Sequence, residues 1–265
     1  MKIFLNNLSA IYRRELQSYF TSPLAYVIAA IFWFISGLFL VTLLFSPEGI
    51  IAQANAADQF GSNFNQDYAV IFLGGYLELL GALSMFVLPM LSMGLYAEER
   101  KQGTLELLAT SPVTNWVVAL GKLLGVVTFF SFMLLPLIIV EIIVLSASEP
   151  AFPFVMLILG NAGLLLLAAG VLSLGMFISS LSASTVLAAI MTFGIVLLLW
   201  IVDVVARALP GALGSAVSHL SLLAHYSDFI QGVFDFSGLV LFISYIVLGL
   251  FLTAQSIETL RFQRA

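Results

Sequence analysis

Three acidic side chains lie within or at the ends of long apolar runs: Glu78, Glu141 and Asp203. A carboxylate is costly in hydrocarbon, so such residues by default indicate a polar pathway or a proton relay. At a rise of about 1.5 Å per helical residue, Glu141 and Asp203 fall near the ends of their runs, where they can reach an interface or pair with Arg207. Glu78 lies deeper, and two roles stay open for it: lining a cavity that opens outward, or forming hydrogen bonds within the bundle.

Nucleotide-binding and metal-binding motifs are not evident in the sequence. A phosphate-binding loop needs the pattern G-x-x-x-x-G-K-[ST], whereas Gly121 and Lys122 are followed by leucine and lack the earlier glycine. The chain therefore cannot bind ATP in that way, and any ATP-derived energy must come from another polypeptide. The two histidines, His219 and His225, are six residues apart without a cysteine or an HExxH motif, so we expect no metal site.

The composition is that of an integral membrane protein. Of 265 residues, 62% are hydrophobic and only 9% are charged, with a mean hydropathy of +1.13. Disulfides and thiol chemistry are excluded because cysteine is absent. An intramembrane enzyme or an ion-coupled carrier would need polar groups converging from several spans, and the few found here disfavour that class.

Six apolar runs are long enough to cross about 30 Å of hydrocarbon. They predict an all-α membrane protein with one domain over residues 1–265. The short joins on either side of the fourth run leave a five-span alternative open. The six runs cover approximately residues 24–45, 69–95, 117–145, 154–178, 184–204 and 238–257.

The basic residues predict the orientation, because short loops rich in Lys and Arg stay on the cytoplasmic side. With six spans, one side of the membrane has Arg207 alone. We therefore predict that both termini lie in the cytoplasm, that the protein is in the inner membrane, and that Lys122 extends its side chain to the inner interface. The basic residues on the cytoplasmic side are Lys2, Arg13, Arg14, Arg100, Lys101, Lys122, Arg261 and Arg264.

Three segments outside the spans have patterns of their own. Residues 4–20 place apolar side chains at helical spacing, which predicts an amphipathic helix on the inner membrane surface that breaks at Pro23; a solvated tail is the alternative. Residues 46–68 are polar and small, which predicts a loop with at most a short helical turn. Residues 206–237 are moderately apolar but interrupted by proline and glycine, which predicts two short helices dipping back into the outer leaflet.

The segment "YAEERKQGTLELLATSPVTNW", residues 96–116, is the longest charge-bearing interruption between two spans. Thr104 can cap a short helix with an apolar leucine side, which Ser111 and Pro112 would end. Such a helix, tied to two spans, suits the docking of a cytoplasmic partner; ordinary positive-inside anchoring is the alternative. Pro89 and Pro136 interrupt the helices of the two adjoining spans, either as hinges or as static kinks.

Three stretches carry a family resemblance that covers nearly the whole chain. "EERKQGTLELLATSPVT" resembles the cytoplasmic loop of ABC-2-type ABC transporter permeases. "RRELQSYFTSPLAYV" (13–27) is similar to the entry into the first span in the gliding-motility and nitrous-oxide-maturation branch of that family. "HYSDFIQGVFDFSGLVLF" (225–242) resembles the segment before the last span in the same branch.

The resemblance implies six spans, an interfacial elbow helix, a coupling helix between spans two and three, and short outer helices before span six. It implies no catalytic residue and no cofactor on this chain, because ATP and Mg²⁺ would be bound by a separate ABC ATPase subunit. The elbow would include Tyr12, Arg13, Arg14 and Glu15. The ATPase-coupling residues would be Glu98, Glu99, Arg100, Gly103, Thr104, Glu106 and Leu107.

The expected function is therefore that of a permease subunit that exports a substrate as a dimer with an identical or paralogous chain. The alternative is a force-transmitting subunit that acts on an envelope partner without moving a solute. Expected partners are the ATPase subunit, the second permease subunit and the lipid bilayer, with an auxiliary envelope protein left open and no nucleic acid. The sequence does not indicate the substrate.

Overall fold

The computed structural model describes residues 2–60, 67–104, 114–146, 148, 154–209 and 211–262, and within these ranges the regular structure is helical without strands. The prediction of an all-α membrane protein is confirmed. The helices are α1 (Lys2–Thr21), α2 (Pro23–Phe45), α3 (Ile50–Phe60), α4 (Tyr68–Ser92), α5 (Gly94–Gln102), α7 (Asn115–Ser146), α8 (Phe154–Leu181), α9 (Thr185–Ala208), α10 (Ala212–Ser218), α11 (Leu222–Ile230) and α12 (Phe236–Phe262).

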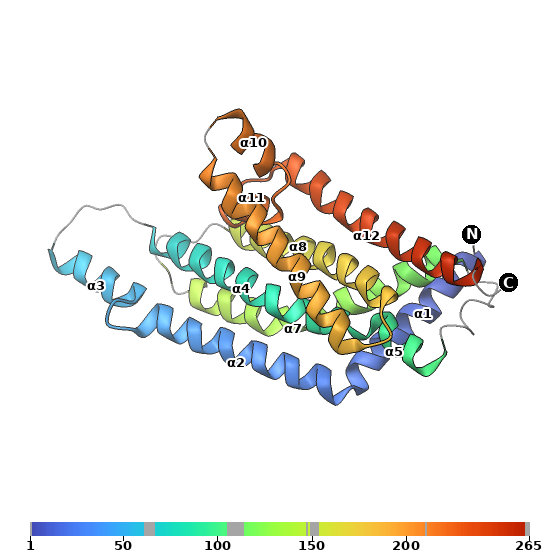
Figure 1. Cartoon of the computed structure of the whole chain (residues 1–265). Coiled ribbons are helices and arrows are strands. Elements are labelled where there is room, and N and C mark those ends of the chain that lie inside the picture. The colour runs from blue at the N-terminus through green and yellow to red at the C-terminus, as the bar shows by residue number, and fades with distance from the viewer. Residues whose placement is uncertain are drawn as a thin grey trace.

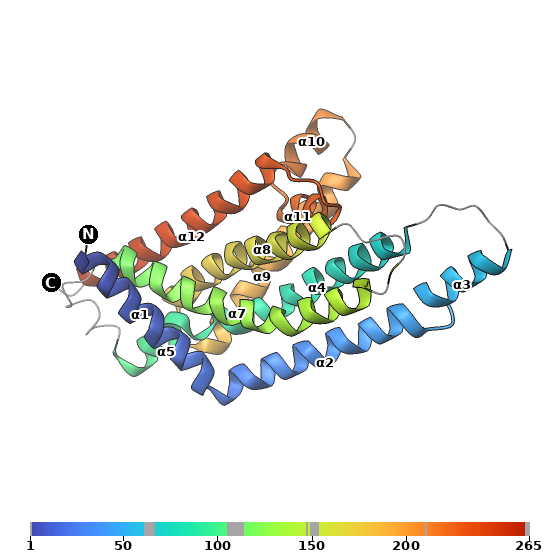
Figure 2. The ribbon, with the colours of Figure 1, turned by 180° about the vertical axis from the view of Figure 1, so that it is seen from behind.

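Six helical segments in the described ranges are long and apolar enough to cross a membrane: those built on α2, α4 with α5, α7, α8, α9 and α12. They match the six predicted runs, so the five-span alternative is wrong. In the most apolar 18-residue stretch of α8, 61% of the residues are buried inside the chain, compared with 17% in the corresponding stretch of α9. Helix α8 thus forms the centre of the bundle, with α4, α7 and α12 packed around it (Figures 1 and 2).

The first residues of α1 and the last residues of α12 lie at the same end of the bundle, which we call the terminal end (Figure 1). Helices α3, α10 and α11 lie at the opposite end (Figures 1 and 2). Helix α1 is separate from α2, because Ser22 is extended and Pro23 occupies the first turn of α2. The predicted break before the first span is confirmed.

Two segments outside the spans differ in how well they were predicted. Residues 206–237 contain two short helices, α10 and α11, as expected, and their predicted dip into the outer leaflet stays a prediction. Residues 46–68 contain the 11-residue helix α3, so the prediction of a loop with a single helical turn is wrong. The sequence of α3, IIAQANAADQF, is rich in alanine, a strong helix former, and helix α2 packs beside it.

Candidate functional site

The second span breaks between α4 and α5, and a hydroxyl group of α8 stabilises the break. Helix α4 continues through Pro89 to Ser92, and α5 starts at Gly94 after a turn at Met93. A new helix start leaves backbone N–H groups without partners in the preceding turn. Oγ of Ser179 accepts hydrogen bonds from the N–H groups of Tyr96 and Ala97, both at 3.0 Å, and donates to the Met93 carbonyl at 2.8 Å.

The ammonium group of Lys122, on α7, connects three helices at the terminal end. Its Nζ donates to the Leu95 carbonyl at 2.7 Å and to carboxylate oxygens of Glu15 and Glu99, both at 3.1 Å. The ring of Tyr96 lies 5.0 Å from the same atom. Lys122 is only 3% exposed, so the prediction that it extends to the interface is wrong. A buried ammonium group needs neutralising partners, and here three acceptors match its three N–H donors.

Two glycines of α7 allow α1 to approach closely enough to join this cluster. A Cβ atom at Gly121 would lie 2.8 Å from Cγ2 of Ile11, and one at Gly125 would lie 2.9 Å from Cβ of Glu15. Glycines at positions i and i+4 give one smooth strip of helix surface, the arrangement that permits close helix contacts in membranes. Any larger side chain would push Glu15 away from Lys122.

The acidic and basic residues of the predicted coupling segment have distinct surroundings on α5. Glu98 is exposed. Glu99 is largely buried and carries the Lys122 ion pair. Arg100 donates from Nη1 to the carbonyl of Ser180 at 2.8 Å, which fixes α5 to the end of α8. Only Glu98 of these three is therefore free of a structural role toward the bundle.

The end of α5 is formed by Gly103 and Thr104. Gly103 has φ +71°, a left-handed conformation that favours glycine, and its N–H donates to the Arg100 carbonyl. Thr104 donates from both its N–H and its hydroxyl to the Glu99 carbonyl, at 3.0 and 3.2 Å. The helix predicted to begin at Thr104, with Glu106 and Leu107, lies outside the described residues.

The four residues assigned to the elbow do not act alike. Tyr12 is partly buried and Arg13 is exposed. The guanidinium of Arg14 is 72% exposed and lies 3.8 Å from Glu99, a long and solvated contact. Glu15 alone reaches the buried cluster.

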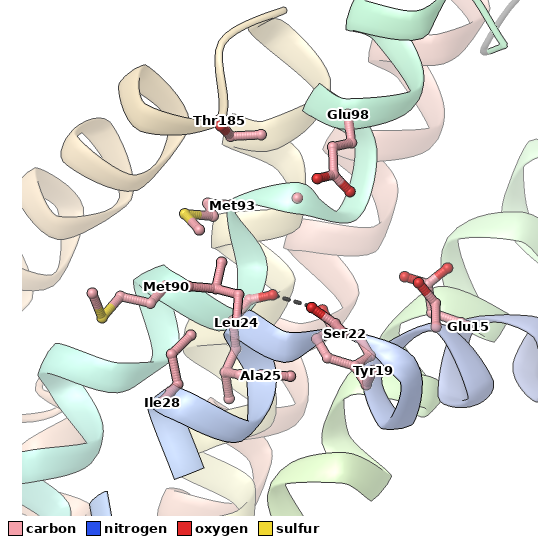
Figure 3. Close-up of a pocket in the computed structure, with 13 residues that line it drawn as sticks. Glu15, Tyr19, Ser22, Leu24, Ala25, Ile28, Met90, Met93, Glu98 and Thr185 are labelled. Carbon is pink, nitrogen blue, oxygen red and sulfur yellow. Dashed lines mark hydrogen bonds between the residues drawn. The ribbon is translucent and has the colours of Figure 1, made fainter. Parts of the chain in front are cut away.

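A cavity of about 160 Å³ lies beside this cluster, between α1, the start of α2, the α4–α5 break and the start of α9. In Figure 3, Glu15 of α1 and Glu98 of α5 approach it from different helices, with Met90 and Met93 along its side. Tyr19 also lines it and donates to the Leu91 carbonyl at 2.6 Å. Burial and the neighbouring carboxylates raise the pKa of Tyr19 well above its usual value, so the hydroxyl remains a donor.

Comparison with models of known protein families identifies the family of this chain. The model of a family described as ABC-2 family transporter protein matches residues 9–264. The chain belongs to the ABC-2 transporter family. The match spans nearly the whole chain and, with six apolar helices, identifies a membrane permease domain of an ABC transporter. The resemblance to the gliding-motility and nitrous-oxide-maturation branch stays a prediction. No curated protein matches the chain significantly.

The intramembrane carboxylates of this ABC-2 chain have three different surroundings. Glu78 is exposed on α4, and none of the described residues forms a hydrogen bond or an ion pair with it, so both of its predicted roles stay predictions. Glu141, near the end of α7, is completely buried and accepts from Nδ2 of Asn161 at 2.8 Å, so its side chain is paired within the bundle and does not extend to an interface. Asp203 pairs with Nε of Arg207 at 3.0 Å, as predicted.

The contacts that Lys122 makes with Glu15 and Glu99, Ser179 with the start of α5, and Asn161 with Glu141 were not predicted from the sequence. A lysine at the end of an apolar run is equally compatible with extension to the interface and with burial, since the sequence does not specify what faces it. The Gly121-x-x-x-Gly125 pattern around Lys122 was the signal that another helix packs closely there.

Proposed function

We propose that this chain is the permease subunit of an ABC exporter and that a separate ATPase subunit docks at residues 98–107. The observation that carries the proposal is the buried cluster in which Lys122 pairs with Glu15 and Glu99. Helix α5 leads directly into the predicted docking segment. A force on that segment would move α1 and α7 together with α5, because separating the cluster would leave buried charges without partners.

The distribution of charge supports an orientation with the terminal end in the cytoplasm of the cell, at the inner membrane. In the described helices, Arg13, Arg14, Arg100 and Lys101 lie at the terminal end, whereas Arg207 lies toward the opposite end. Positive charge in short loops is retained on the cytoplasmic side. The ATPase subunit, which would hold ATP and Mg²⁺, would meet the chain from that side.

The face of α4 that carries Glu78 supports assembly with a second permease subunit, identical or paralogous. Ile71, Glu78 and Phe86 are exposed at helical spacing on this face, and the ring of Phe86 contacts Phe193 of α9. An ionised carboxylate is costly toward lipid. We therefore assign this face to the dimer seam, where Glu78 would line the translocation path.

The docking proposal can be tested by affinity purification of the tagged chain from membranes, with the co-purified protein identified by mass spectrometry and assayed for ATP hydrolysis. Glu98→Lys combined with Leu107→Asp should abolish recovery of an ABC ATPase, because it reverses an exposed charge and removes an apolar contact in the predicted docking segment. Glu48→Lys, an exposed charge reversal at the opposite end, is the matched control and should retain the ATPase. Recovery of the ATPase with the double variant would exclude docking at this segment.

Export and force transmission differ in their need for a water-accessible path along Glu78. Because the chain has no native cysteine, Glu78→Cys gives a single thiol for labelling with a charged, membrane-impermeant reagent. A labelling rate that changes with the nucleotide state of the assembled complex supports export. A thiol that stays as unreactive as that of the exposed, apolar control Ile139→Cys indicates a sealed seam and favours the force-transmitting alternative.

A further inference from the structure

A histidine and two carboxylates converge at the opposite end of the bundle, away from the predicted docking segment. Nδ1 of His225, on α11, lies 3.1 Å from Oδ2 of Asp235 and 3.8 Å from Oδ2 of Asp228. One ligand atom from each of the three residues lies within 4.8 Å of the others. Three side chains from two segments of the chain therefore bring one nitrogen and two oxygens close together.

His225 is the observation that sets this group apart from a surface cluster of acids. The residue is 6% exposed, and both ring nitrogens are buried without a hydrogen bond to any described residue. Although Nδ1 is close to Asp235, the two groups are not aligned as a hydrogen bond. A buried polar side chain normally has its partners, so an imidazole nitrogen aimed at two carboxylates without a hydrogen bond needs an explanation.

The local fold holds the three side chains in place. Gly232 has φ +77°, a conformation open to glycine, and turns the chain after α11 so that Asp235 returns beside His225. The Asp235 carboxylate accepts from the N–H groups of Ser237 and Gly238 at 2.9 and 3.0 Å, which caps α12. Gly238 leaves room for the imidazole, since a Cβ atom there would lie 3.2 Å from Nδ1.

We propose that His225, Asp228 and Asp235 form a binding site for a divalent transition-metal ion of the zinc type, with water completing the coordination. Zinc takes His nitrogen and carboxylate oxygen at roughly 2.0–2.2 Å, so neighbouring ligands in a tetrahedral site lie about 3.3 Å apart. The separations from Nδ1 to the two carboxylate oxygens, 3.1 and 3.8 Å, lie on either side of that value. Mixed imidazole and carboxylate ligands suit Zn²⁺ better than Mg²⁺ or Ca²⁺, which prefer oxygen alone.

The proposed site differs from the expectation from sequence that the chain has no metal site, an expectation that stays untested. That expectation compared His225 with the other histidine, His219, which is exposed and stacks with its ring centroid 6.4 Å away. The two carboxylates are three and ten residues beyond His225, a spacing that matches no motif used for the prediction. A bound ion would connect α11 to the start of α12 and so fix the short helices of the opposite end.

The proposal is independent of the permease function, and its test uses the full-length chain purified in detergent with a tag that contains no histidine. Zn²⁺ binding is measured by equilibrium dialysis with elemental analysis. The wild-type chain should bind one Zn²⁺ per molecule. Asp228→Asn, at a side chain that is 47% exposed and caps no helix, should weaken binding at least tenfold while leaving the metal-free thermal midpoint unchanged.

Two further variants complete the test. His219→Ala should bind Zn²⁺ as the wild type does, because His219 belongs outside the three-residue group. His225→Gln should lose binding and also lose the rise in thermal midpoint that Zn²⁺ gives the wild type. The proposal is overturned if the wild-type chain binds no Zn²⁺, or if Asp228→Asn binds it as tightly as the wild type. Either result would mean that His225 serves only as a packed ion-pair partner of Asp235.

Discussion

At the terminal end, the ammonium group of Lys122 on α7 bridges the carboxylates of Glu15 and Glu99 from two other helices. At the opposite end, Asp203 pairs with Arg207 four residues along the same helix and accepts a hydrogen bond from Ser221 at the start of α11. The first arrangement joins α1, α5 and α7 through charges that are all largely buried. The second joins α9 to α11 through one neutral hydroxyl, with a partly solvated ion pair inside α9.

This difference indicates how the two ends respond to force. Moving one helix of the terminal-end cluster would leave buried charges on the other two helices without partners. We therefore expect α1, α5 and α7 to move as a unit. At the opposite end, the Asp203–Arg207 pair is retained whatever α11 does, since both residues belong to α9. The Asp203–Arg207 pair therefore opposes a shift of α11 less than the terminal-end cluster opposes a shift of α5.

The largest predicted effect follows from removing the charge at the centre of the cluster. Lys122→Met should lower the free energy of unfolding by about 3–5 kcal/mol, because two largely buried carboxylates lose their counter-ion. The thermal midpoint of the purified chain measures this effect. Lys101→Met, at an exposed lysine of the same end, should change it by less than about 0.5 kcal/mol.

A neutral version of the same cluster sharpens this prediction. Combining Lys122→Met with Glu15→Gln and Glu99→Gln should recover a substantial part of the lost stability, since no buried charge remains unpaired. If Lys122→Met alone has the same thermal midpoint as the Lys101→Met control, the cluster does not connect the helices as described.

Close packing of α1 on α7 gives the next largest effect. Gly125→Leu should cost roughly 1–3 kcal/mol, because the new side chain meets Cβ of Glu15 at the helix contact. Gly37→Leu is the control, since no atom of the described residues would lie within 4 Å of a Cβ atom at that position. Equal thermal midpoints for the two variants would show that α1 is loosely held.

The opposite end should respond more weakly. Ser221→Ala removes the hydrogen bond to Asp203 and the cap that Oγ of Ser221 gives to the N–H of Ala224, so it should cost about 1–2 kcal/mol. Ser218→Ala, which removes an exposed hydroxyl bond to a local carbonyl, should cost much less. A loss as large as that of Lys122→Met would remove the contrast between the two ends.

The smallest effect is expected within the terminal end itself. Arg14→Gln should change the free energy of unfolding by less than about 1 kcal/mol, because the guanidinium is mostly solvated and 3.8 Å from Glu99. Any difference from the wild type should disappear at high salt. A loss above 2 kcal/mol that persists in salt would assign Arg14 to the buried cluster.

The prediction from sequence was accurate where the signal was local. A run of about 20 apolar residues must be helical in hydrocarbon, since its backbone groups have no other partners, and this determined the number and approximate limits of the six spans. Pro23 determined the break between α1 and α2, because proline disfavours helix at the preceding residue. The motif around Glu98 and Glu99 indicated the ABC-2 family.

The sequence alone did not determine which side chains meet across the bundle. Glu15 and Lys122 are 107 positions apart, and the imidazole of His225 meets Asp235 only after the turn at Gly232. Apolar runs leave the rotation of each helix about its axis undefined, because every face is hydrophobic. Tertiary packing alone placed Lys122 and Glu141 in the interior and Glu78 on the exposed face of α4, since it decides which face of each span meets another helix.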